Sequence, residues 1–376
     1  IAFVHVSLVP VVGPVGEQKT KPTQHSVREL RASGIIPDMV VCRSETVLDD
    51  ETKDKLSKFC HVSKDAVISA HDVSNIYRVP LLLEEQGVQK LLGETLNISV
   101  QANNSMLNEW REMAQNVDSI STKVNIAMVG KYTGLSDSYL SVMKALQHAS
   151  FAVGRELVID WIEASNLEKD FENTNTKEYS EAWKLLEKAD GILVPGGFGD
   201  RGTEGKILAA RYARENNKPY LGICLGLQIA VIEFCRNVLG WKDANSTEFD
   251  EQTPHPVIVY MPEVSKTHLG GTMRLGSRTT ILNDSKSHAA NLYQSAEQID
   301  ERHRHRYEVN PEIIDEIEKH GLKFVGKDET GQRMEILELS EHPYFFATQY
   351  HPEFKTRPNK PSPPFLGLLK AAIGET

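Results

Sequence analysis

A single cysteine stands where a predicted buried strand turns directly into a predicted helix. The apolar segment 219–223 precedes Cys224, and the residues after Leu225 have helical spacing. Gly222 and Gly226 leave room for a tight turn that lifts the side chain above a sheet. The partial positive charge of a helix N-terminus favours a thiolate, the form of cysteine that attacks a carbonyl carbon. The alternative is an inert core cysteine, which is our interpretation of Cys42, Cys60 and Cys235.

A nucleophile of this kind needs a base, and a histidine and a glutamate follow another apolar strand. His351 and Glu353 flank Pro352, directly after the predicted strand 344–348. Sites in α/β sheets lie at strand ends, and a carboxylate that orients an imidazole completes a catalytic triad. The alternative is a loop histidine beside a surface carboxylate. The presence of Cys224 favours the triad, because paired motifs strengthen one another.

A glycine-rich turn can supply the remaining element, a site for a negatively charged oxygen. Residues 195–199 read Pro-Gly-Gly-Phe-Gly and follow the predicted strand 191–195. Glycine lets backbone N–H groups approach and stabilise a developing oxyanion. The alternative is a plain tight turn. Its position, one βαβ unit before Cys224, favours the oxyanion interpretation.

Length and pattern predict an α/β protein of two domains, each with a mainly parallel sheet flanked by helices. The chain has 376 residues, more than one ordinary core requires. Strand and helix patterns alternate over 1–86 and again over 123–376, while 87–122 has the pattern of a helical linker. The first ten residues resemble a buried strand already under way, so we expect the chain to begin inside a domain. In the second domain, Ser136 is expected to cap a helix that runs to about residue 152.

The individual elements are predicted from apolar periodicity and turn residues. Helices are expected at 23–33, 49–59, 136–152, 179–188, 203–215, 225–238 and from 365; strands are expected at 37–43, 66–70, 124–130, 157–162, 191–195, 219–223 and 344–348, with β-rich segments at 257–281 and 323–339.

Composition argues against nucleic-acid-binding, membrane-spanning and secreted proteins. A net charge of −10 argues against a broad nucleic-acid surface, which needs a basic balance. No apolar run reaches the roughly 18 residues of a membrane span, and no secretory signal is visible. Four cysteines without a CxxC pair are typical of reduced intracellular thiols. We therefore predict a cytoplasmic protein that contacts neither membrane nor nucleic acid.

The three motifs together resemble the class I glutamine amidotransferases. Gly-Gly-Phe-Gly at 196–199, Gly-Ile-Cys-Leu-Gly-Leu-Gln at 222–228 and His-Pro-Glu at 351–353 carry this resemblance. It implies that a cysteine attacks the side-chain amide of glutamine, forms a thioester and releases ammonia. The implied roles are Cys224 as nucleophile, His351 as base and acid, Glu353 as orienting carboxylate, and the backbone N–H groups of Gly197 and Leu225 as the oxyanion site.

Further motifs resemble one branch of these enzymes, the CTP synthase family. They are Asn-Ser-Thr-Glu-Phe at 245–249, Gly-Gly-Thr-Met-Arg-Leu-Gly at 270–276 and the His/Arg-rich segment 301–310, which would otherwise be interpreted as a solvated charge cluster. The resemblance implies a glutamine site of Gly196, Gln228, Glu248, Arg306 and Tyr307. Residues 16–27 extend it to nucleotides, with two lysines and a glutamine at a predicted helix start. An ordinary charged loop is the alternative there.

The family resemblance covers the whole chain and implies a set of nucleotide sites. UTP and CTP are assigned to Lys19, Lys21, Gln24, Lys55 and Phe59; ATP to Arg43, His71, Asp72 and Val73; the activator GTP, between the domains, to Lys131, Tyr132, Phe198 and Arg306.

The implied activity is that of a carbon–nitrogen ligase in pyrimidine biosynthesis. It is the ATP-dependent amination of UTP to CTP with ammonia from glutamine, with CTP as feedback inhibitor. The family's phosphate loop and Mg²⁺ carboxylates are absent from these residues, so we expect no metal ligands here and only glutaminase activity from this chain alone. The implied assembly is a homotetramer that can form filaments. Ser180 stands where animal members have a filament-contact histidine.

Two other classes of function remain open. One is another hydrolase of this fold, such as a γ-glutamyl hydrolase or a peptidase, or another class I amidotransferase. The lysine cluster near the start of the chain argues against them. The other is a structural or filament-forming protein without activity, against which the intact triad argues.

Overall fold

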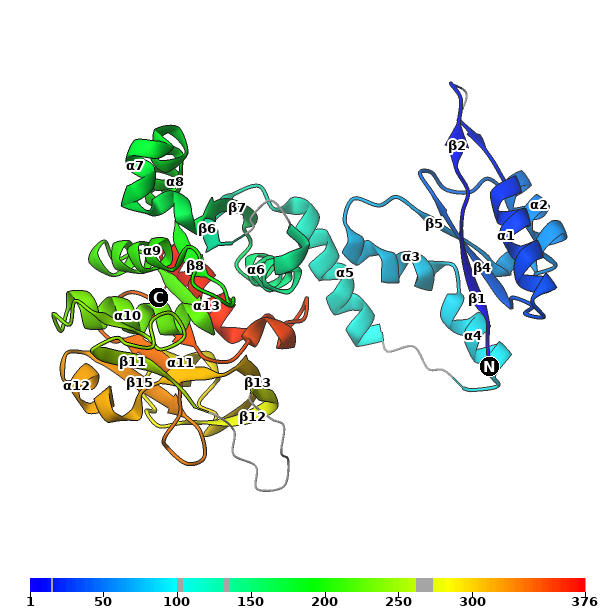
Figure 1. The fold of residues 1–376 in the computed structure, drawn as a ribbon. Helices are drawn as coiled ribbons and strands as arrows, with labels where there is room; N and C mark the ends of the chain where they lie inside the picture. Colours follow the sequence, from blue (N-terminus) through cyan, green and yellow to red (C-terminus); the bar gives the residue numbers. More distant parts are fainter. Residues whose placement is uncertain (15, 100–103, 132–135, 262–272, 376) are drawn as a thin grey trace. The chain divides into compact units, whose positions relative to one another are not determined.

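The computed structural model divides the chain into two compact units, residues 1–120 and 121–376. It describes all residues except 15, 100–103, 132–135, 262–272 and 376. Each unit is an α/β structure with its own sheet, as the sequence predicts (Figure 1). Among the described residues, no helix is both long and apolar enough to cross a bilayer.

The N-terminal unit is built on three parallel strands in the order β1-β4-β5. One face is covered by α1 and α2, whose Val27 and Leu56 pack against Val40 of β4. The elements are β1 (Val4–Leu8), β2 (Val11–Val12), β3 (Glu17–Gln18), α1 (Lys21–Ala32), β4 (Met39–Ser44), α2 (Asp50–Cys60), β5 (Val67–His71), α3 (Val79–Glu85), α4 (Val88–Leu96) and α5 (Asn104–Ser119).

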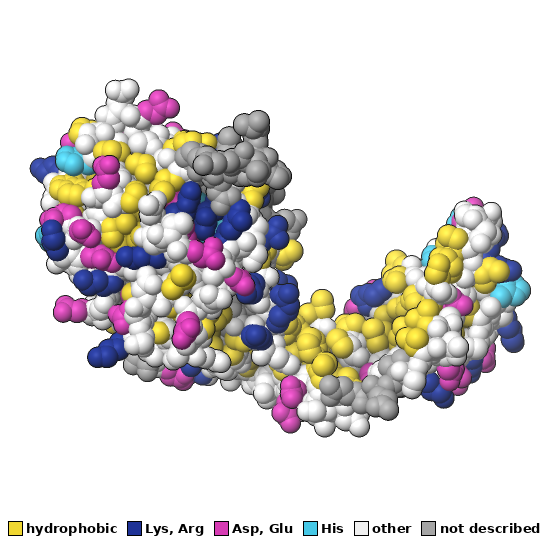
Figure 2. Space-filling view, turned by 90° about the horizontal axis from the view of Figure 1, so that it is seen from below, with side chains coloured by type: hydrophobic (Ala, Val, Ile, Leu, Met, Phe, Trp, Pro, Cys, Tyr) yellow, Lys and Arg dark blue, Asp and Glu magenta, His cyan; other side chains and the backbone are white. Residues whose placement is uncertain are grey.

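The expectation that the first strand is buried is wrong. Among the residues that the structure describes, β1 pairs with β4 alone, and Val4, Val6 and Leu8 are 42%, 64% and 58% exposed. The alternate residues face α1, where His5 Nε2 and Ser26 Oγ are 2.7 Å apart. Figure 2 shows hydrophobic side chains gathered on the surface of this unit, on the right of the view. Apolar character alone indicated a core strand, whereas the paired elements expose one of its faces.

The C-terminal unit has a nine-stranded sheet in the order β13-β12-β15-β16-β17-β9-β8-β6-β7. Strands β17, β9, β8, β6 and β7 run parallel, and the other four continue the sheet antiparallel. Helices α8, α9 and α10 pack on one face, and α6 and α13 pack on the other (Figure 1).

The elements of this unit have the following bounds: β6 (Lys123–Gly130), α6 (Leu140–Ala152), β7 (Glu156–Glu163), η4 (Ala164–Leu167), α7 (Lys169–Thr174), α8 (Thr176–Lys188), β8 (Gly191–Val194), α9 (Thr203–Glu215), β9 (Tyr220–Ile223), α10 (Leu225–Asn237), β10 (Ala244–Ser246), β11 (His255–Tyr260), β12 (Arg274–Leu282), α11 (His288–Leu292), β13 (Gln298–His305), β14 (Tyr307–Val309), α12 (Ile314–Lys319), β15 (Leu322–Lys327), β16 (Met334–Leu339), β17 (Phe345–Thr348) and α13 (Pro363–Ala372).

The predicted helix at 136–152 begins differently from expectation. Residues Ser136–Tyr139 form a 3₁₀ turn, and α6 starts only at Leu140. Its N-cap is Tyr139, which makes no side-chain cap hydrogen bond, so the prediction that Ser136 caps this helix is wrong. The hydroxyl of Tyr139 instead donates to the carbonyl of Lys131 at 2.8 Å. This hydrogen bond to a residue eight positions earlier therefore accompanies the helix start, in place of a side-chain cap.

Helix α10 lies unusually close to the sheet because a glycine of the helix, Gly226, faces a glycine of β9, Gly222. A Cβ on Gly222 of β9 would lie 2.6 Å from the backbone of Gly226. A Cβ on Gly226 would lie 2.2 Å from the carbonyl oxygen of Val194 in β8. Real Cβ atoms do not approach backbone so closely, so both positions require glycine.

This packing predicts a large cost for Gly226→Ala. The methyl group must push α10 off β8, and overpacking of this kind costs about 3 kcal/mol in free energy of unfolding. Gly240→Ala is the control, because Gly240 has φ 80° but open space around its Cβ position, which implies a cost of about 1 kcal/mol. Urea denaturation measures both variants. Equal destabilisation would show that the close approach is not a constraint.

Candidate active site

Cys224 occupies a strained turn between β9 and α10. Its φ is 53° and its ψ is −101°, a conformation that residues with a side chain rarely adopt. Its N–H donates to the carbonyl of Thr348 in the neighbouring β17 at 2.6 Å. The side chain therefore stands at the N-terminus of α10, of which Cys224 is the N-cap.

His351 and Glu353 follow β17, the strand that pairs in parallel with β9. His351 Nδ1 lies 2.8 Å from Glu353 Oε1, so the carboxylate orients the ring. The ring also approaches the glycine turn after β8, because a Cβ on Gly196 would lie 2.9 Å from His351 Cε1 and 3.4 Å from Cys224 Cβ. The ends of the three adjacent strands β8, β9 and β17 thus converge.

A cavity of about 290 Å³ opens over these residues. Its walls combine the three strand ends with the start of α6 and one residue of β13: Ser138, Tyr139, Leu140, Ser141, Val142, Pro195, Gly196, Gly197, Phe198, Cys224, Arg304, His351, Glu353 and Phe354. Gly197 and Leu225 lie at its edge, since a Cβ on Gly197 would meet Leu225 Cδ2 at 3.7 Å. Their backbone N–H groups belong to the two segments that flank the sulfur.

The charges in this cavity support a cysteine–histidine pair. Burial opposes protonation of His351, but the neighbouring Cys224 sulfur and the Glu353 carboxylate raise its pKa to about 10. The imidazole is therefore protonated at neutral pH, and its Nδ1 is hydrogen-bonded to the Glu353 carboxylate. A proton on this ring is available to a group that leaves from a carbon attached to the sulfur.

The glycine turn is supported from below by Lys131. Its ammonium donates to the carbonyls of Phe198 at 2.6 Å and Gly199 at 2.8 Å. Gly199 has φ 77°, a conformation that glycine adopts without strain. Lys131 and Phe198, two of the predicted GTP residues, therefore meet at this turn. Tyr132, another of them, lies outside the described residues.

Strand β13 aligns the reacting groups through its backbone, which sequence reasoning missed. The carbonyl of Arg302 accepts from the His351 N–H at 2.8 Å, and that of Arg304 lies 3.9 Å from Cys224 Sγ. The guanidinium of Arg304 stacks 5.8 Å from the ring centre of Phe198. A signal existed in the alternation of 301–306, where arginines take one face and histidines the other.

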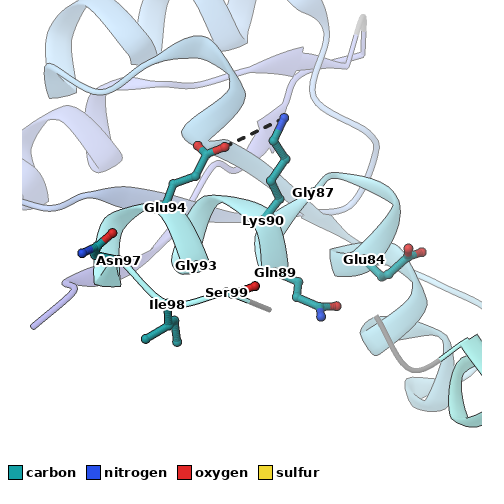
Figure 3. A pocket seen from close by; sticks show the side chains of 9 residues that line it. All are labelled: Glu84, Gly87, Gln89, Lys90, Gly93, Glu94, Asn97, Ile98 and Ser99. Atoms are coloured by element: carbon teal, nitrogen blue, oxygen red, sulfur yellow. Dashed lines mark ion pairs between the residues drawn. The ribbon is translucent and has the colours of Figure 1, made fainter. Parts of the chain in front are cut away.

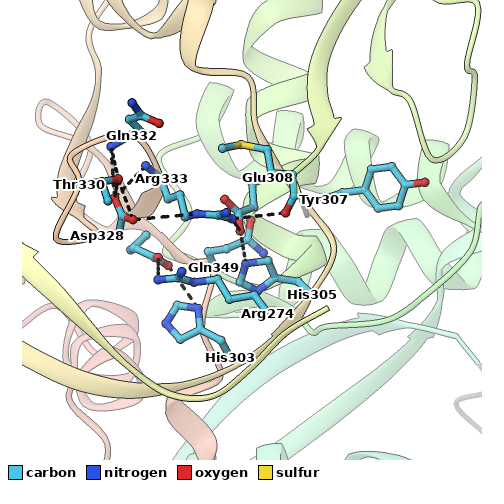
Figure 4. A network of polar contacts seen from close by, with 12 residues as sticks. Arg274, His303, His305, Tyr307, Glu308, Asp328, Thr330, Gln332, Arg333 and Gln349 are labelled. Carbon is cyan, nitrogen blue, oxygen red and sulfur yellow. Dashed lines mark hydrogen bonds and ion pairs between the residues drawn. The ribbon is translucent and has the colours of Figure 1, made fainter. Parts of the chain in front are cut away.

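Behind β13 lies a buried polar network (Figure 4). Glu335 contacts Arg274 at 3.2 Å, and its oxygen is 3.4 Å from His303 Nδ1. Burial lowers the pKa of His303 to about 2 and raises that of Glu335 to about 8, so His303 is neutral. Glu308 joins His305, at 2.8 Å, to Arg333. These contacts fix the strand that touches Cys224 and His351.

The predicted glutamine residues lie around this site in different ways. Gln228 is buried and donates from Nε2 to the carbonyl of Tyr307 at 2.8 Å. A further residue, Gln349, lies 3.8 Å from Cys224 Sγ through its Nε2 and was not predicted. Glu248 contributes to the charge balance of Lys131. Arg306, which is also a predicted GTP residue, and Glu248 do not line the cavity itself.

In the N-terminal unit, the predicted UTP and CTP residues fall into two groups. Lys21, Gln24 and Phe59 line an open groove of about 930 Å³ between α1 and α2. The groove is basic, because its other lining residues include His25, Arg28, Arg31 and His61. Lys19 and Lys55 lie elsewhere, near Glu17, with a Lys19–Glu17 distance of 2.5 Å.

The predicted ATP residues meet at the carboxyl ends of β4 and β5. Arg43 pairs with Asp72 at 2.7 Å and donates to the carbonyl of Ala70 at 2.6 Å. His71 ends β5, and Val73 follows two residues later. Strand ends of parallel sheets are common ligand sites, so this placement is compatible with a nucleotide.

One further cavity, of about 580 Å³, contains none of the predicted residues (Figure 3). It lies along α4, and its charged groups include Lys90 and Glu94, which face each other at 3.9 Å. In the part of the chain that the structure describes, no group of three or more His, Cys, Asp or Glu side chains could hold a metal ion.

Comparison with known proteins yields two family matches. The model described as "Glutamine amidotransferase class-I" matches residues 135–371, and the one described as "CTP synthase N-terminus" matches residues 1–98. The CTP synthase of Dictyostelium discoideum is 57% identical, and the alignment covers 99% of this chain and 68% of that protein. For CTP synthase 1 of Homo sapiens, identity is 55%, with 99% and 63% covered. The chain thus spans about two thirds of the length of these relatives.

A solved structure that is similar to about two thirds of this chain comes from the same family of relatives. It is the glutaminase domain of Trypanosoma brucei CTPS with bound acivicin, with a TM-score of 0.61 and 39% identity. The match covers 68% of this chain and 95% of that one.

The geometry predicts the titration of His351. Its pKa of about 10, raised above the ordinary 6.5, adds stability that is fully present below pH 6.5 and is lost as pH rises through 10. We expect Glu353→Gln to lower this pKa, because it removes the carboxylate that balances the imidazolium. An NMR titration of the histidine ring measures it. The exposed Glu341→Gln is the control, and identical titration in both variants would contradict the assigned pairing.

Proposed function

The chain belongs to the CTP synthase family, and we propose that the full-length protein converts UTP to CTP with ammonia that it releases from glutamine. The observation that carries this proposal is the convergence of Cys224, His351 and Glu353 at adjacent strand ends. Because the chain spans about two thirds of its curated relatives, the complete activity is assigned to the full-length protein.

The glutaminase reaction follows from the groups in the cavity. The Cys224 sulfur attacks the side-chain amide carbon of glutamine, and the oxygen becomes negatively charged. The N–H groups of Gly197 and Leu225 stabilise this oxyanion. The His351 imidazolium, held by Glu353, gives its proton to the leaving nitrogen, and ammonia departs. Water, deprotonated by the now neutral His351, then hydrolyses the thioester and restores the cysteine.

The remaining site residues serve substrate recognition in this proposal. Gly196, Gln228, Glu248, Arg306 and Tyr307 bind the glutamine. Gln228 is already fixed by the Tyr307 carbonyl, which supports a role in shaping this pocket. Gln349 adds an amide donor beside the sulfur.

The ammonia is used in the amidoligase reaction. Phosphoryl transfer from ATP to the uracil O4 creates a leaving group, and ammonia displaces phosphate at C4. The basic groove with Lys21, Gln24 and Phe59 supports a triphosphate and pyrimidine site. Lys19 and Lys55, which lie near Glu17 outside this groove, are assigned to the same nucleotides from the family resemblance. The cluster of Arg43, His71, Asp72 and Val73 is assigned to ATP.

Regulation and assembly are proposed from the family alone. CTP inhibits by competing at the UTP site, and GTP activates glutamine hydrolysis near Lys131, Tyr132, Phe198 and Arg306. The protein is cytoplasmic and forms a homotetramer that can stack into filaments. Mg²⁺ accompanies ATP in this family. The described residues offer no cluster of ligands for it, so we derive no step through a metal.

A γ-glutamyl hydrolase or peptidase would use the same triad. The match of residues 1–98 to the CTP synthase N-terminus disfavours both. Glutaminase activity of the full-length protein, measured with and without GTP, tests the proposal. Stimulation by GTP supports it, and the absence of ammonia under both conditions would contradict it.

Cys224→Ala should separate the two half-reactions. Without the sulfur, the full-length protein should lose glutamine-dependent CTP formation by at least about 10³-fold. It should keep the ammonia-dependent reaction, because exogenous ammonia bypasses the cavity. Cys235→Ala, at a buried cysteine of α10, is the matched control. Loss of both reactions in Cys224→Ala alone would mean that this cysteine is structural.

Lys21→Ala should weaken nucleotide binding without affecting glutamine hydrolysis. A lost charge-assisted contact to phosphate corresponds to roughly a tenfold rise in Kd for UTP and CTP. Isothermal titration of the full-length protein measures both constants. Lys90→Ala serves as control, since Lys90 lies on α4 and pairs with Glu94. Unchanged affinity for both nucleotides would remove Lys21 from the site.

A further inference from the structure

Lys206, in the first turn of α9, is a buried lysine that the mechanism above does not use. Its side chain is 1% exposed and ranks among the largest fully buried side chains of the described chain. Lysine is almost never buried so completely unless it is paired. Within the described residues, its ammonium has neither a hydrogen bond nor an ion pair. An uncompensated charge at this place needs an explanation.

The ammonium of Lys206 lies beside the glycine turn. Its Nζ is 3.8 Å from the position that a Cβ on Gly197 would take, and Leu225 Cδ2 is 3.7 Å from that same position. The neighbouring Lys131 Nζ is equally near the corresponding position on Gly199. Two lysine side chains therefore lie next to the turn. Of the two, Lys131 donates hydrogen bonds to its carbonyl groups, and Lys206 does not.

Close packing fixes Lys206 in this place. A Cβ on Gly205 would lie 1.8 Å from the carbonyl oxygen of Ala164, so the start of α9 is pressed against η4. The N–H of Gly205 donates to Glu168 Oε1 at 3.3 Å. The lysine therefore cannot move away from the turn without shifting the helix.

The electrostatic surroundings leave this cation responsive to added negative charge. Burial and, to a smaller extent, the neighbouring Lys131 lower the pKa of Lys206 to about 7, although Glu163 opposes them. The side chain of Glu168 also faces this helix start. A negative charge that forms nearby would favour the ammonium form.

We propose that Lys206 is a positioning residue that acts through the Gly197 peptide, orienting and polarising its N–H towards the oxyanion of glutamine hydrolysis. This role rests on the proposed function and extends it. The interaction is strongest when the oxygen is negatively charged, so it lowers the barrier without tightening substrate binding. Lys131 holds the conformation of the turn through its two hydrogen bonds, whereas the Lys206 ammonium supplies an electric field at the Gly197 peptide.

The test uses Lys206→Met in the full-length protein, since methionine keeps the length of the side chain without the charge. Glutaminase kcat should fall about tenfold or more while KM stays within about twofold, because the contact strengthens only in the transition state. Alkylation of Cys224 by iodoacetamide, which forms no oxyanion, should keep its rate. Lys206→Arg, which retains a cation, should recover part of kcat.

Lys218→Met is the matched control, because Lys218 is a partly buried lysine whose ammonium donates to the Ala189 carbonyl. It should leave kcat unchanged. Unaltered kcat in Lys206→Met would overturn the proposal. If Lys206→Met lowered the alkylation rate of Cys224 as much as it lowers kcat, or abolished ammonia-dependent CTP formation, the proposal would be overturned in favour of a structural role. Absence of glutaminase activity in the unmodified protein would overturn the proposed function as well.

Discussion

The backbone of Cys224, at φ 53°, is the constraint on which the candidate site depends. Strained conformations persist only where the surroundings determine them completely. Here the carbonyl of Thr348 in β17 accepts a hydrogen bond from the Cys224 N–H. The close approach of Gly226 to the Val194 carbonyl fixes the position of α10 on the other side. The turn thereby projects a sulfur atom between the groups that follow β8 and β17.

Burial acts on every ionisable group around this turn, and the neighbours decide the outcome. His303 and His351 are both buried, yet the pKa of His303 falls to about 2 and that of His351 rises to about 10. His351 faces a sulfur and a carboxylate, whereas His303 lies beside Arg274 and beside Glu335, whose own pKa burial raises to about 8. The same physics lowers the pKa of Lys206. The His351 imidazole therefore carries a proton that it can donate, whereas the His303 imidazole is neutral and belongs to the buried polar network behind β13.

Prediction from sequence was accurate for local structure, which depends on neighbours along the chain. A strand, a cysteine flanked by glycines and a helix are local, and so is the pairing of His351 with Glu353. Prediction failed for the exposed face of β1 and for the start of α6, where a 3₁₀ turn precedes the helix and the Tyr139 hydroxyl bonds the Lys131 carbonyl. Strand β13 was missed because an alternation of arginine and histidine has the composition of a solvated surface. The buried partners of its histidines, such as Glu335 and Glu308, come from other strands.

The sequence by itself determined the α/β class, the order of most elements and the residue types at the three strand ends. These features follow from periodicity and from turn residues, which act over a few positions. Only the tertiary structure decided that the Arg302 and Arg304 carbonyls frame Cys224 and His351, and that Lys206 lies beneath Gly197. Such contacts depend on which strands become neighbours and how closely helices pack. Those distances are determined by the packing of the whole sheet, and no local pattern encodes them.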